Sequence, residues 1–254
     1  MDFPKTPSFR LDEKRALVAG ASSGIGLACA AALAEHGAAV TLSARREDKL
    51  EEAATAMKDK GWQVETMPLD VADIDATGAA VDAAEPYDVL LNAAGLARHS
   101  PAKETRADDF DAVMGVNLRG AYFLAQAVAR KLIAADRKGS IITISSQMGH
   151  VGGQDRAVYC ASKHAVEGFT KAMAIEWGPA GVRINTICPT FVLTDLTRPT
   201  FDNPERRAWI EEKIKLGRAG EVEDIMGAAV YLASDASALV TGTALLIDGG
   251  WTAD

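Results

Sequence analysis

The chain has 254 residues, of which 48% are apolar and 24% charged, and its formal net charge is −8. This is the composition of a globular protein, and it excludes a disordered chain, a collagen-like chain and a charge-rich tail protein. The acidic balance makes nucleic acid or an anionic membrane surface a poor partner, so we expect neither.

Neither a membrane span nor a secretory signal is evident, because no apolar run reaches about 18 residues and the first ten residues have no apolar core. Cys29, Cys160 and Cys188 are scattered and odd in number, so they offer neither a disulfide framework nor a metal-binding pair. The four histidines lack metal-ligand spacing. We therefore expect a cytoplasmic protein with no metal site.

Short apolar runs alternate with helical patterns along the chain. The expected strands cover residues 15–19, 38–43, 62–69, 88–91, 140–144, 182–188 and 243–247. The expected helices cover residues 24–36, 47–60, 73–84, 107–135, 156–177 and 221–234. This alternation predicts one α/β domain over residues 1–254, a doubly wound parallel sheet of seven strands with helices on both faces.

One segment, residues 190–216, breaks this alternation. It contains two prolines, the aromatic residues Phe191 and Phe201, and a charged helical stretch, 204–215. A long insertion after the carboxyl end of a strand lies where ligands bind in this class of fold. We expect a substrate lid here, and a plain surface excursion is the alternative.

A glycine cluster joins the first expected strand to the first expected helix. It reads Gly20-Ala-Ser-Ser-Gly24-Ile-Gly26. Glycines at this position allow a tight turn and bring the backbone and the helix N-terminus close to a pyrophosphate. The pattern predicts a Rossmann-type dinucleotide site, with a simple turn as the alternative.

The end of the second expected strand indicates which dinucleotide binds. An acidic residue there would accept from a ribose 2′-hydroxyl, whereas this chain has Ala44 followed by Arg45 and Arg46. A guanidinium favours a 2′-phosphate, so we expect NADP(H), with NAD(H) possible. The alternative is that both arginines pair with Glu47 or Asp48 in solvent.

Tyr159 and Lys163 lie four residues apart on one expected helix, and Ser146 ends the strand before it. A phenol titrates near pH 10, so acid–base work near neutrality needs a nearby cation, which Lys163 can provide. Ser146 would hydrogen-bond the substrate oxygen. An ordinary buried tyrosine is the alternative.

Together these motifs resemble the classical short-chain dehydrogenases/reductases, in the family's order and over nearly the whole chain. The matching pieces are Gly20–Gly26, Asn92-Ala-Ala-Gly95, Val116-Asn117, Ile144-Ser-Ser146, Tyr159-x-x-x-Lys163, Pro189 and Asp248-Gly-Gly250. The resemblance implies a catalytic tetrad of Asn117, Ser146, Tyr159 and Lys163, in which Asn117 bends its helix and holds a water of a proton relay. It also implies a homotetramer.

The cofactor site combines the residue patterns with this resemblance. The resemblance implies that the backbone of Val192 and the hydroxyl of Thr194 meet the nicotinamide carboxamide. Asp70 stands at the end of the third expected strand and would meet the adenine amine, although helix capping explains it equally well. The full set is Gly20, Ser22, Ser23, Gly24, Ile25, Gly26, Arg45, Asp70, Val71, Asn92, Ala93, Tyr159, Lys163, Pro189, Val192 and Thr194. Ala19, Ala93 and Thr190 depart from the usual family residues, and the last of these puts the shape of the nicotinamide loop in doubt.

The substrate is expected to be a small carbonyl or alcohol compound. Ser146-Gln147, Val158-Tyr159-Cys160 and Cys188-Pro-Thr190 are similar to the L-xylulose reductases and related sugar or polyol reductases. Gln147, His150 and Gln154 would serve hydroxyls, with Phe191 beside them, although a solvated loop is as good an explanation. Leu96, His99, Leu196, Trp209 and Trp251 are further pocket candidates.

These observations predict an NAD(P)-dependent oxidoreductase that interconverts a carbonyl and a secondary alcohol, on a sugar, polyol or small hydroxy ketone. Two alternatives remain open: a 3-oxoacyl thioester reductase and a non-catalytic dinucleotide sensor. A sensor has no need of Tyr159 and Lys163 together. The acidic net charge argues mildly against docking an acidic carrier protein, unless a local basic patch provides the site, such as Arg130, Lys131, Arg137 and Lys138.

Overall fold

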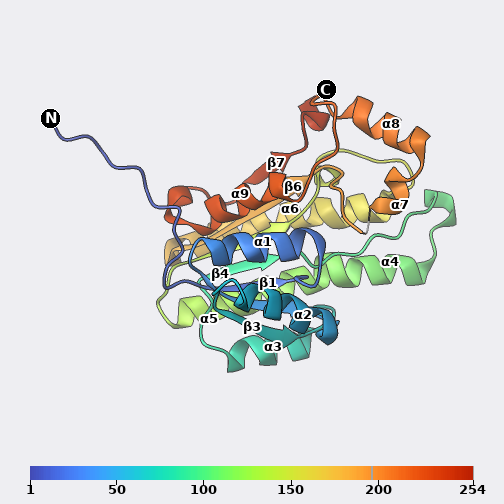
Figure 1. The fold of residues 1–254 in the computed structure, drawn as a ribbon. Coiled ribbons are helices and arrows are strands. Elements are labelled where there is room, and N and C mark those ends of the chain that lie inside the picture. The colour runs from blue at the N-terminus through green and yellow to red at the C-terminus, as the bar shows by residue number, and fades with distance from the viewer. Residues whose placement is uncertain (196, 254) are drawn as a thin grey trace.

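A computed structural model of the chain describes residues 1–195 and 197–253. Seven parallel strands form one sheet in the order β3-β2-β1-β4-β5-β6-β7 (Figure 1). The strands are β1 (Arg15–Ala19), β2 (Ala39–Ala44), β3 (Val64–Pro68), β4 (Val89–Asn92), β5 (Gly139–Ile144), β6 (Val182–Pro189) and β7 (Ala244–Ile247). The predicted doubly wound α/β fold is confirmed.

The direction of winding reverses between β1 and β4, which are neighbours in the sheet but far apart in sequence. Ala19 at the end of β1 lies opposite Asn92 at the end of β4. In a doubly wound sheet, ligands bind outside the carboxyl ends of the strands at such a reversal. The topology therefore places the glycine cluster and the Asn92 loop on one edge.

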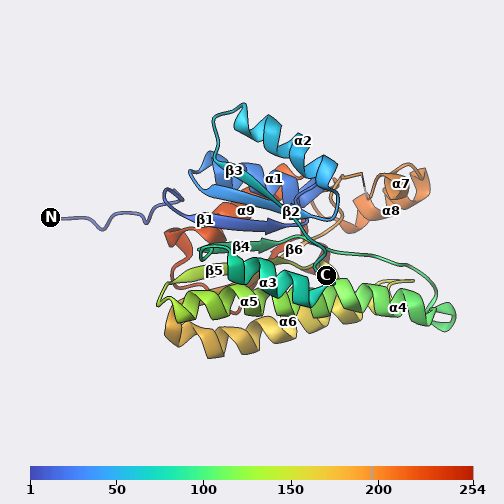
Figure 2. The same cartoon turned by 90° about the horizontal axis from the view of Figure 1, so that it is seen from below.

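Helices cover both faces of the sheet (Figure 2). Each face has its own apolar core. One face carries α1 (Gly24–Glu35), α2 (Glu47–Lys58) and α9 (Glu223–Ala233). The other carries α3 (Ile74–Ala83), α5 (Ala121–Ala134) and α6 (Ala157–Trp177). Strands buried on both sides explain the near-continuous apolar runs seen in the sequence.

The expected continuous helix over residues 107–135 is wrong in detail. The structure has α4 (Ala107–Met114), a π-helical segment (Gly115–Gly120) and then α5. A side chain at Gly120 would lie 2.5 Å from the carbonyl oxygen of Val71, so the helix packs closely against the loop after β3 at this point. Single π turns inside helices are frequent at functional sites, and this one contains Asn117.

Other boundaries differ from the expected ones by one to a few residues. The third strand begins at Val64 rather than at residue 62, because Gly61 adopts a φ of +81° and the turn continues past it. Asp73 caps α3 as expected, accepting a hydrogen bond from the amide of Ala76 at 3.0 Å.

The segment after β6 forms two short helices, α7 (Arg198–Phe201) and α8 (Pro204–Lys213), which project beyond the sheet (Figures 1 and 2). Asn203 caps α8 through the amide of Arg206, and Pro204 follows at the first helical position. Phe201, Ile210 and Ile214 form a small apolar cluster of their own. The expected helix over residues 204–215 thus ends slightly earlier.

Short 3-10 turns complete the described chain, at Ala102–Glu104, Gln147–Gly149, Gly178–Ala180, Asp235–Ser237 and Trp251–Ala253. Within residues 1–195 and 197–253, no helix is both long enough and apolar enough to cross a membrane.

Candidate active site

The glycine cluster forms a tight loop between β1 and the N-terminus of α1. Gly20 has a φ of +79°, and a side chain there would lie 2.6 Å from the amide nitrogen of Ala94. A side chain at Gly26 would lie 2.3 Å from the carbonyl oxygen of Gly20. Only glycine fits at both positions, and the resulting approach exposes the amides of the first turn of α1 to an anion.

A cavity of about 440 Å³ runs over this loop and past the ends of β2 and β3. Most of the predicted cofactor residues line it: Gly20, Ser22, Ser23, Gly24, Ile25, Gly26, Arg45, Asp70, Val71, Ala93 and Thr194. The loop, the helix N-terminus and the two adjacent guanidiniums fit the pyrophosphate and phosphate groups of a dinucleotide.

Arg45 and Arg46 occupy different positions at the end of β2. Arg46 donates to the hydroxyl oxygens of Ser22 at 3.0 Å and Ser23 at 3.4 Å, and so contacts the glycine loop directly. Arg45 lies 3.9 Å from Asp70, a distant ion pair between exposed side chains. Arg46 is not among the cofactor residues predicted from the sequence, although the pair Arg45-Arg46 is visible there.

A smaller cavity of about 180 Å³ continues from this cleft toward the end of β6. Pro189, Val192 and Thr194 line it together with Ser146, Tyr159 and Lys163. The structure therefore brings the predicted nicotinamide residues and three of the four predicted tetrad residues around one space. Asn92 lies behind it, buried, with its oxygen accepting from the amide of Ala94 at 3.1 Å and its amide nitrogen without a partner.

Ser146, Tyr159 and Lys163 converge from two elements. Ser146 follows β5, and its hydroxyl accepts from the amide of Met148 at 3.1 Å. Tyr159 and Lys163 share one face of α6, with the ammonium 5.7 Å from the centre of the phenol ring. Lys163 donates to the carbonyl oxygen of Ile144 at 2.9 Å, which fixes the buried ammonium beside the end of β5.

Asn117 connects the π-helical segment to this group. Its side-chain oxygen accepts from the amide of Leu96 at 2.7 Å. Its side-chain nitrogen donates to the carbonyl of Leu96 at 2.8 Å and to the hydroxyl of Ser162 at 3.1 Å. Asn117 thus ties the loop after β4 to α6, next to Lys163.

The pKa of the Tyr159 phenol is shifted by burial and by two neighbouring groups. Burial raises the pKa of the phenol, whereas its hydrogen bond with Ser146 and the charge of Arg156 lower that pKa. Arg156, which the sequence did not single out, is therefore a cation that acts on the phenol, and the ammonium of Lys163 lies 5.7 Å from the centre of the same ring. Burial also lowers the pKa of Lys163 to about 8, against the opposing effect of Cys188 and Glu167.

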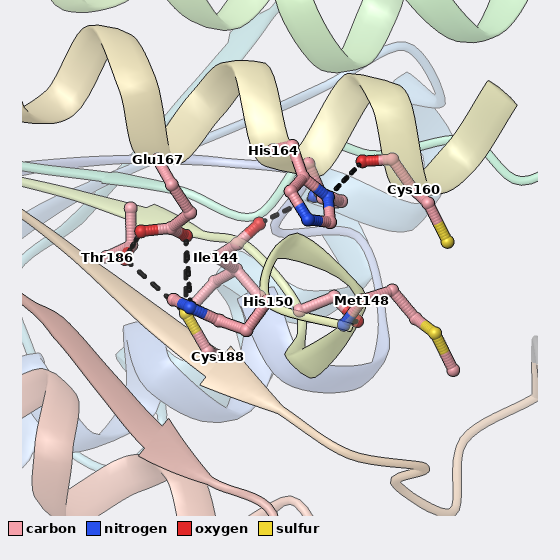
Figure 3. A network of polar contacts seen from close by, with 10 residues as sticks. Ile144, Met148, His150, Cys160, His164, Glu167, Thr186 and Cys188 are labelled. Atoms are coloured by element: carbon pink, nitrogen blue, oxygen red, sulfur yellow. Dashed lines mark hydrogen bonds and ion pairs between the residues drawn. The ribbon is translucent and has the colours of Figure 1, made fainter. Parts of the chain in front are cut away.

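A polar network that the sequence did not predict surrounds Glu167 of α6 (Figure 3). The buried carboxylate of Glu167 accepts from Thr186 at 2.9 Å and from the thiol of Cys188 at 3.3 Å, and His150 lies 4.0 Å away. The histidine, carboxylate and thiol atoms lie within 4.8 Å of one another, which is a zinc-type donor set. However, burial raises the pKa of Cys188 to about 12, so the thiol is protonated and acts as a hydrogen-bond donor.

A third cavity, of about 680 Å³, lies between the 147–156 loop and α8. Tyr159 does not line it, but the ring of His99, which does, is 6.0 Å from the ring of Tyr159. Gln154 and Phe191 line it as predicted, together with His99, Arg156, Arg206, Trp209 and Trp251. His150 is not among its lining residues and turns to Glu167 instead. Gln147 lines neither this cavity nor the one at Tyr159; it is buried, and neither its amide oxygen nor its nitrogen has a hydrogen-bond partner. Leu196 lies outside the described residues.

Comparison with known proteins agrees with this geometry. Residues 20–252 match the family model described as enoyl-(acyl carrier protein) reductase. The D-threitol dehydrogenase of Mycolicibacterium smegmatis is 43% identical to this chain, covering 96% of it and 95% of that protein. The D-erythrulose reductase of Gallus gallus is 39% identical, covering 96% and 98%.

Among solved structures, a gluconate 5-dehydrogenase from Burkholderia cenocepacia in complex with NADP and tartrate has a TM-score of 0.94 and 38% identity. The match covers 97% of this chain and 98% of that one. The chain belongs to the short-chain dehydrogenase/reductase family. It is an NAD(P)-dependent oxidoreductase that interconverts a CH–OH group and a carbonyl.

Proposed function

We propose that the enzyme acts on a sugar, a polyol or a small hydroxy ketone and uses NADP(H) in preference to NAD(H). The observation that carries the substrate class is the cavity between the 147–156 loop and α8, where aromatic walls meet polar side chains. Carbohydrates need this combination, because they present both C–H faces and hydroxyl groups. The named relatives, which include a threitol dehydrogenase and an erythrulose reductase, support the same class.

The chemistry follows from the geometry around Tyr159. When bound, NADP(H) supplies or accepts the hydride at the reacting carbon. Tyr159 donates its proton to the carbonyl oxygen during reduction and takes it back during oxidation. Ser146 holds the same oxygen, and Lys163, fixed by Ile144, provides positive charge beside the phenol.

Two further groups have roles in this proposal. Asn117 holds the π-helical segment against α6 and keeps open the path of the proton relay. Gln147 binds a substrate hydroxyl, since a buried amide with no protein partner is costly unless a ligand or water satisfies it. Residues 190–216, with their own apolar cluster, act as the lid.

The preference for NADP(H) rests on Arg45 and Arg46, which stand beside the cleft where a carboxylate would favour NAD(H). Neighbouring structures with bound NADP support this, among them the gluconate 5-dehydrogenase above.

We also propose a cytoplasmic homotetramer. Large apolar side chains remain exposed on the helices α4 to α6 and near the C-terminal strand, where a self-association surface would cover them: Phe110, Tyr122, Phe123, Ile133, Ile175 and Leu246. Light scattering of the purified protein tests the tetramer directly.

The substrate class is tested by a steady-state screen with both cofactors over ketoses, polyols, diketones and 3-oxoacyl thioesters. The proposal predicts the highest kcat/KM for a polyol or ketose with NADP(H). Higher kcat/KM for the 3-oxoacyl thioesters would contradict it and favour the acyl-carrier chemistry named in the description of the family model.

A further inference from the structure

We propose that the substrate carries a carboxylate, and that Arg156 and Arg206 bind it in the cavity between the 147–156 loop and α8. This inference rests on the proposed function and narrows its substrate class from sugars and polyols in general to polyhydroxy acids. This cavity has a volume of about 680 Å³.

Arg156 stands at the N-terminus of α6, half-buried, and lines this cavity. It contacts the ring nitrogen Nε2 of His99 at 2.5 Å and lies over the ring of Phe191, 5.1 Å from the centroid. Among the described residues, no carboxylate forms an ion pair with it. Burial lowers its pKa, as expected for a guanidinium that is partly desolvated without a counter-ion.

His99 cannot be that counter-ion. Burial and the charges of Arg156 and Arg206 lower its pKa to about 4, so at neutral pH it is an uncharged acceptor for Arg156. The histidine therefore fixes the direction of the guanidinium without forming an ion pair with it, and the charge of Asp155 acts on the guanidinium only from a distance. The His99 ring is also 6.0 Å from the ring of Tyr159, edge to face, which links this cavity to the one that Tyr159 lines.

Arg206 faces the same space from α8, in the lid. Its charge lowers the pKa of both Arg156 and His99, so the two guanidiniums act on one another across the cavity. Arg206 has no ion pair within the part of the chain that the structure describes. Asp155 and Glu205 also border the cavity, but both are exposed to solvent and neither pairs with either arginine.

Two like charges that face one cavity repel each other, and an anion between them removes that cost. A guanidinium binds a carboxylate through charge-assisted and often bidentate hydrogen bonds. Because Arg206 belongs to the lid, a carboxylate held by both arginines would draw α8 toward α6. Phe191, Trp209 and Trp251 pack against one another and would line the carbon chain of such a substrate.

The test compares acids with polyols of equal length: D-gluconate with D-glucitol, and D-threonate with D-threitol. Binding to the enzyme–NADP⁺ complex is measured by calorimetry, and oxidation by steady-state kinetics. Of the two acids, we expect the one that binds more tightly to have a Kd about ten- to a hundredfold lower than the polyol of equal length. Arg156→Met and Arg206→Met should each remove most of this preference, whereas Arg156→Lys should keep part of it.

Arg207→Met is the matched control, because Arg207 neighbours Arg206 on α8 but pairs with Glu211 at 2.8 Å and does not line the cavity. The Arg207→Met enzyme should prefer the acid over the polyol by the same factor as the parent enzyme. Equal binding of acid and polyol by the parent enzyme, or an unchanged preference in Arg156→Met, would overturn the carboxylate site and leave the proposed function intact. Tight binding of acids without turnover of any carbonyl or alcohol would contradict the proposed function instead.

Discussion

Lys163 donates a hydrogen bond to the backbone carbonyl of Ile144, 2.9 Å away, and so joins α6 to the end of β5. The bond has a functional consequence, because Ser146 follows Ile144 by two residues and Tyr159 precedes Lys163 by one helical turn. The relative position of the serine, the phenol and the ammonium is thereby fixed before any ligand binds, which is the preorganisation that proton transfer requires.

The charge on Lys163 depends on Glu167, one turn further along α6. Burial lowers the pKa of Lys163 to about 8, and the carboxylate of Glu167 acts in the opposite direction. Glu167→Gln should therefore lower the pKa of Lys163 further, so the ammonium loses its proton at a lower pH. The alkaline limb of the pH profile for carbonyl reduction should move to lower pH.

This prediction is checked by kcat/KM for reduction across the alkaline range. Glu167→Asp should restore part of the profile, and Glu176→Gln, an exposed carboxylate on the same helix, serves as the control. A profile that does not move in folded Glu167→Gln would assign Glu167 to structure alone.

Cofactor preference should follow the two arginines at the end of β2. Replacing Arg46 by Gln removes its contacts with Ser22 and Ser23 and one charge beside the expected 2′-phosphate. We expect the Kd for NADPH to rise about ten- to a hundredfold, with little change for NADH. Arg45→Gln should act in the same direction, and rising salt should weaken the parent's preference.

Fluorescence titration with both reduced cofactors measures this directly. If Arg45→Gln and Arg46→Gln weakened NADH and NADPH equally, neither arginine would discriminate between them. The double change Ala44→Asp with Arg45→Gln should reverse the preference, since a carboxylate repels the phosphate and accepts from the ribose hydroxyl.

The close approach at Gly26 predicts a change in stability. Gly26→Ala would place a methyl group 2.3 Å from the carbonyl oxygen of Gly20, so the loop must shift. We expect a loss of more than about 1 kcal/mol in the free energy of unfolding, together with weaker cofactor binding. Gly227→Ala in α9 is the control: nothing lies within 4 Å of the added methyl group, and a gain of about 0.5–1 kcal/mol is expected. Urea unfolding measures the free energy of unfolding of both variants. A Gly26→Ala protein as stable as the parent would refute the close packing at Gly26.

The fold and most of the cofactor site could be predicted from the sequence, because both depend on patterns among residues that are close together in the chain. Alternating apolar runs and helices require a parallel sheet, and the Gly20–Gly26 cluster requires a turn at its edge. The π-helical segment could not be read in the same way, since the close packing of Gly120 against Val71 brings together distant parts of the chain.

The substrate side was less predictable for the same reason. His150 was expected at the substrate, but a buried carboxylate from α6 lies beside it, and only the packing of α6 on β6 reveals that pairing. Arg156 could not be predicted from the sequence, because a single arginine before a helix is an ordinary sequence feature. Its importance comes from burial beside His99 and Phe191, which are distant in the sequence.

The central claim is that Tyr159 exchanges a proton with the substrate oxygen. Tyr159→Phe removes one hydroxyl and leaves the Lys163–Ile144 bond and the dinucleotide cleft in place. The decisive measurement is kcat for the best carbonyl substrate of the screen, with the Kd of NADPH determined on the same preparation. We predict a fall in kcat of at least about a hundredfold, with a Kd close to that of the parent. A Tyr159→Phe enzyme that binds NADPH normally and reduces the substrate at near the parental rate would contradict the proton transfer by Tyr159.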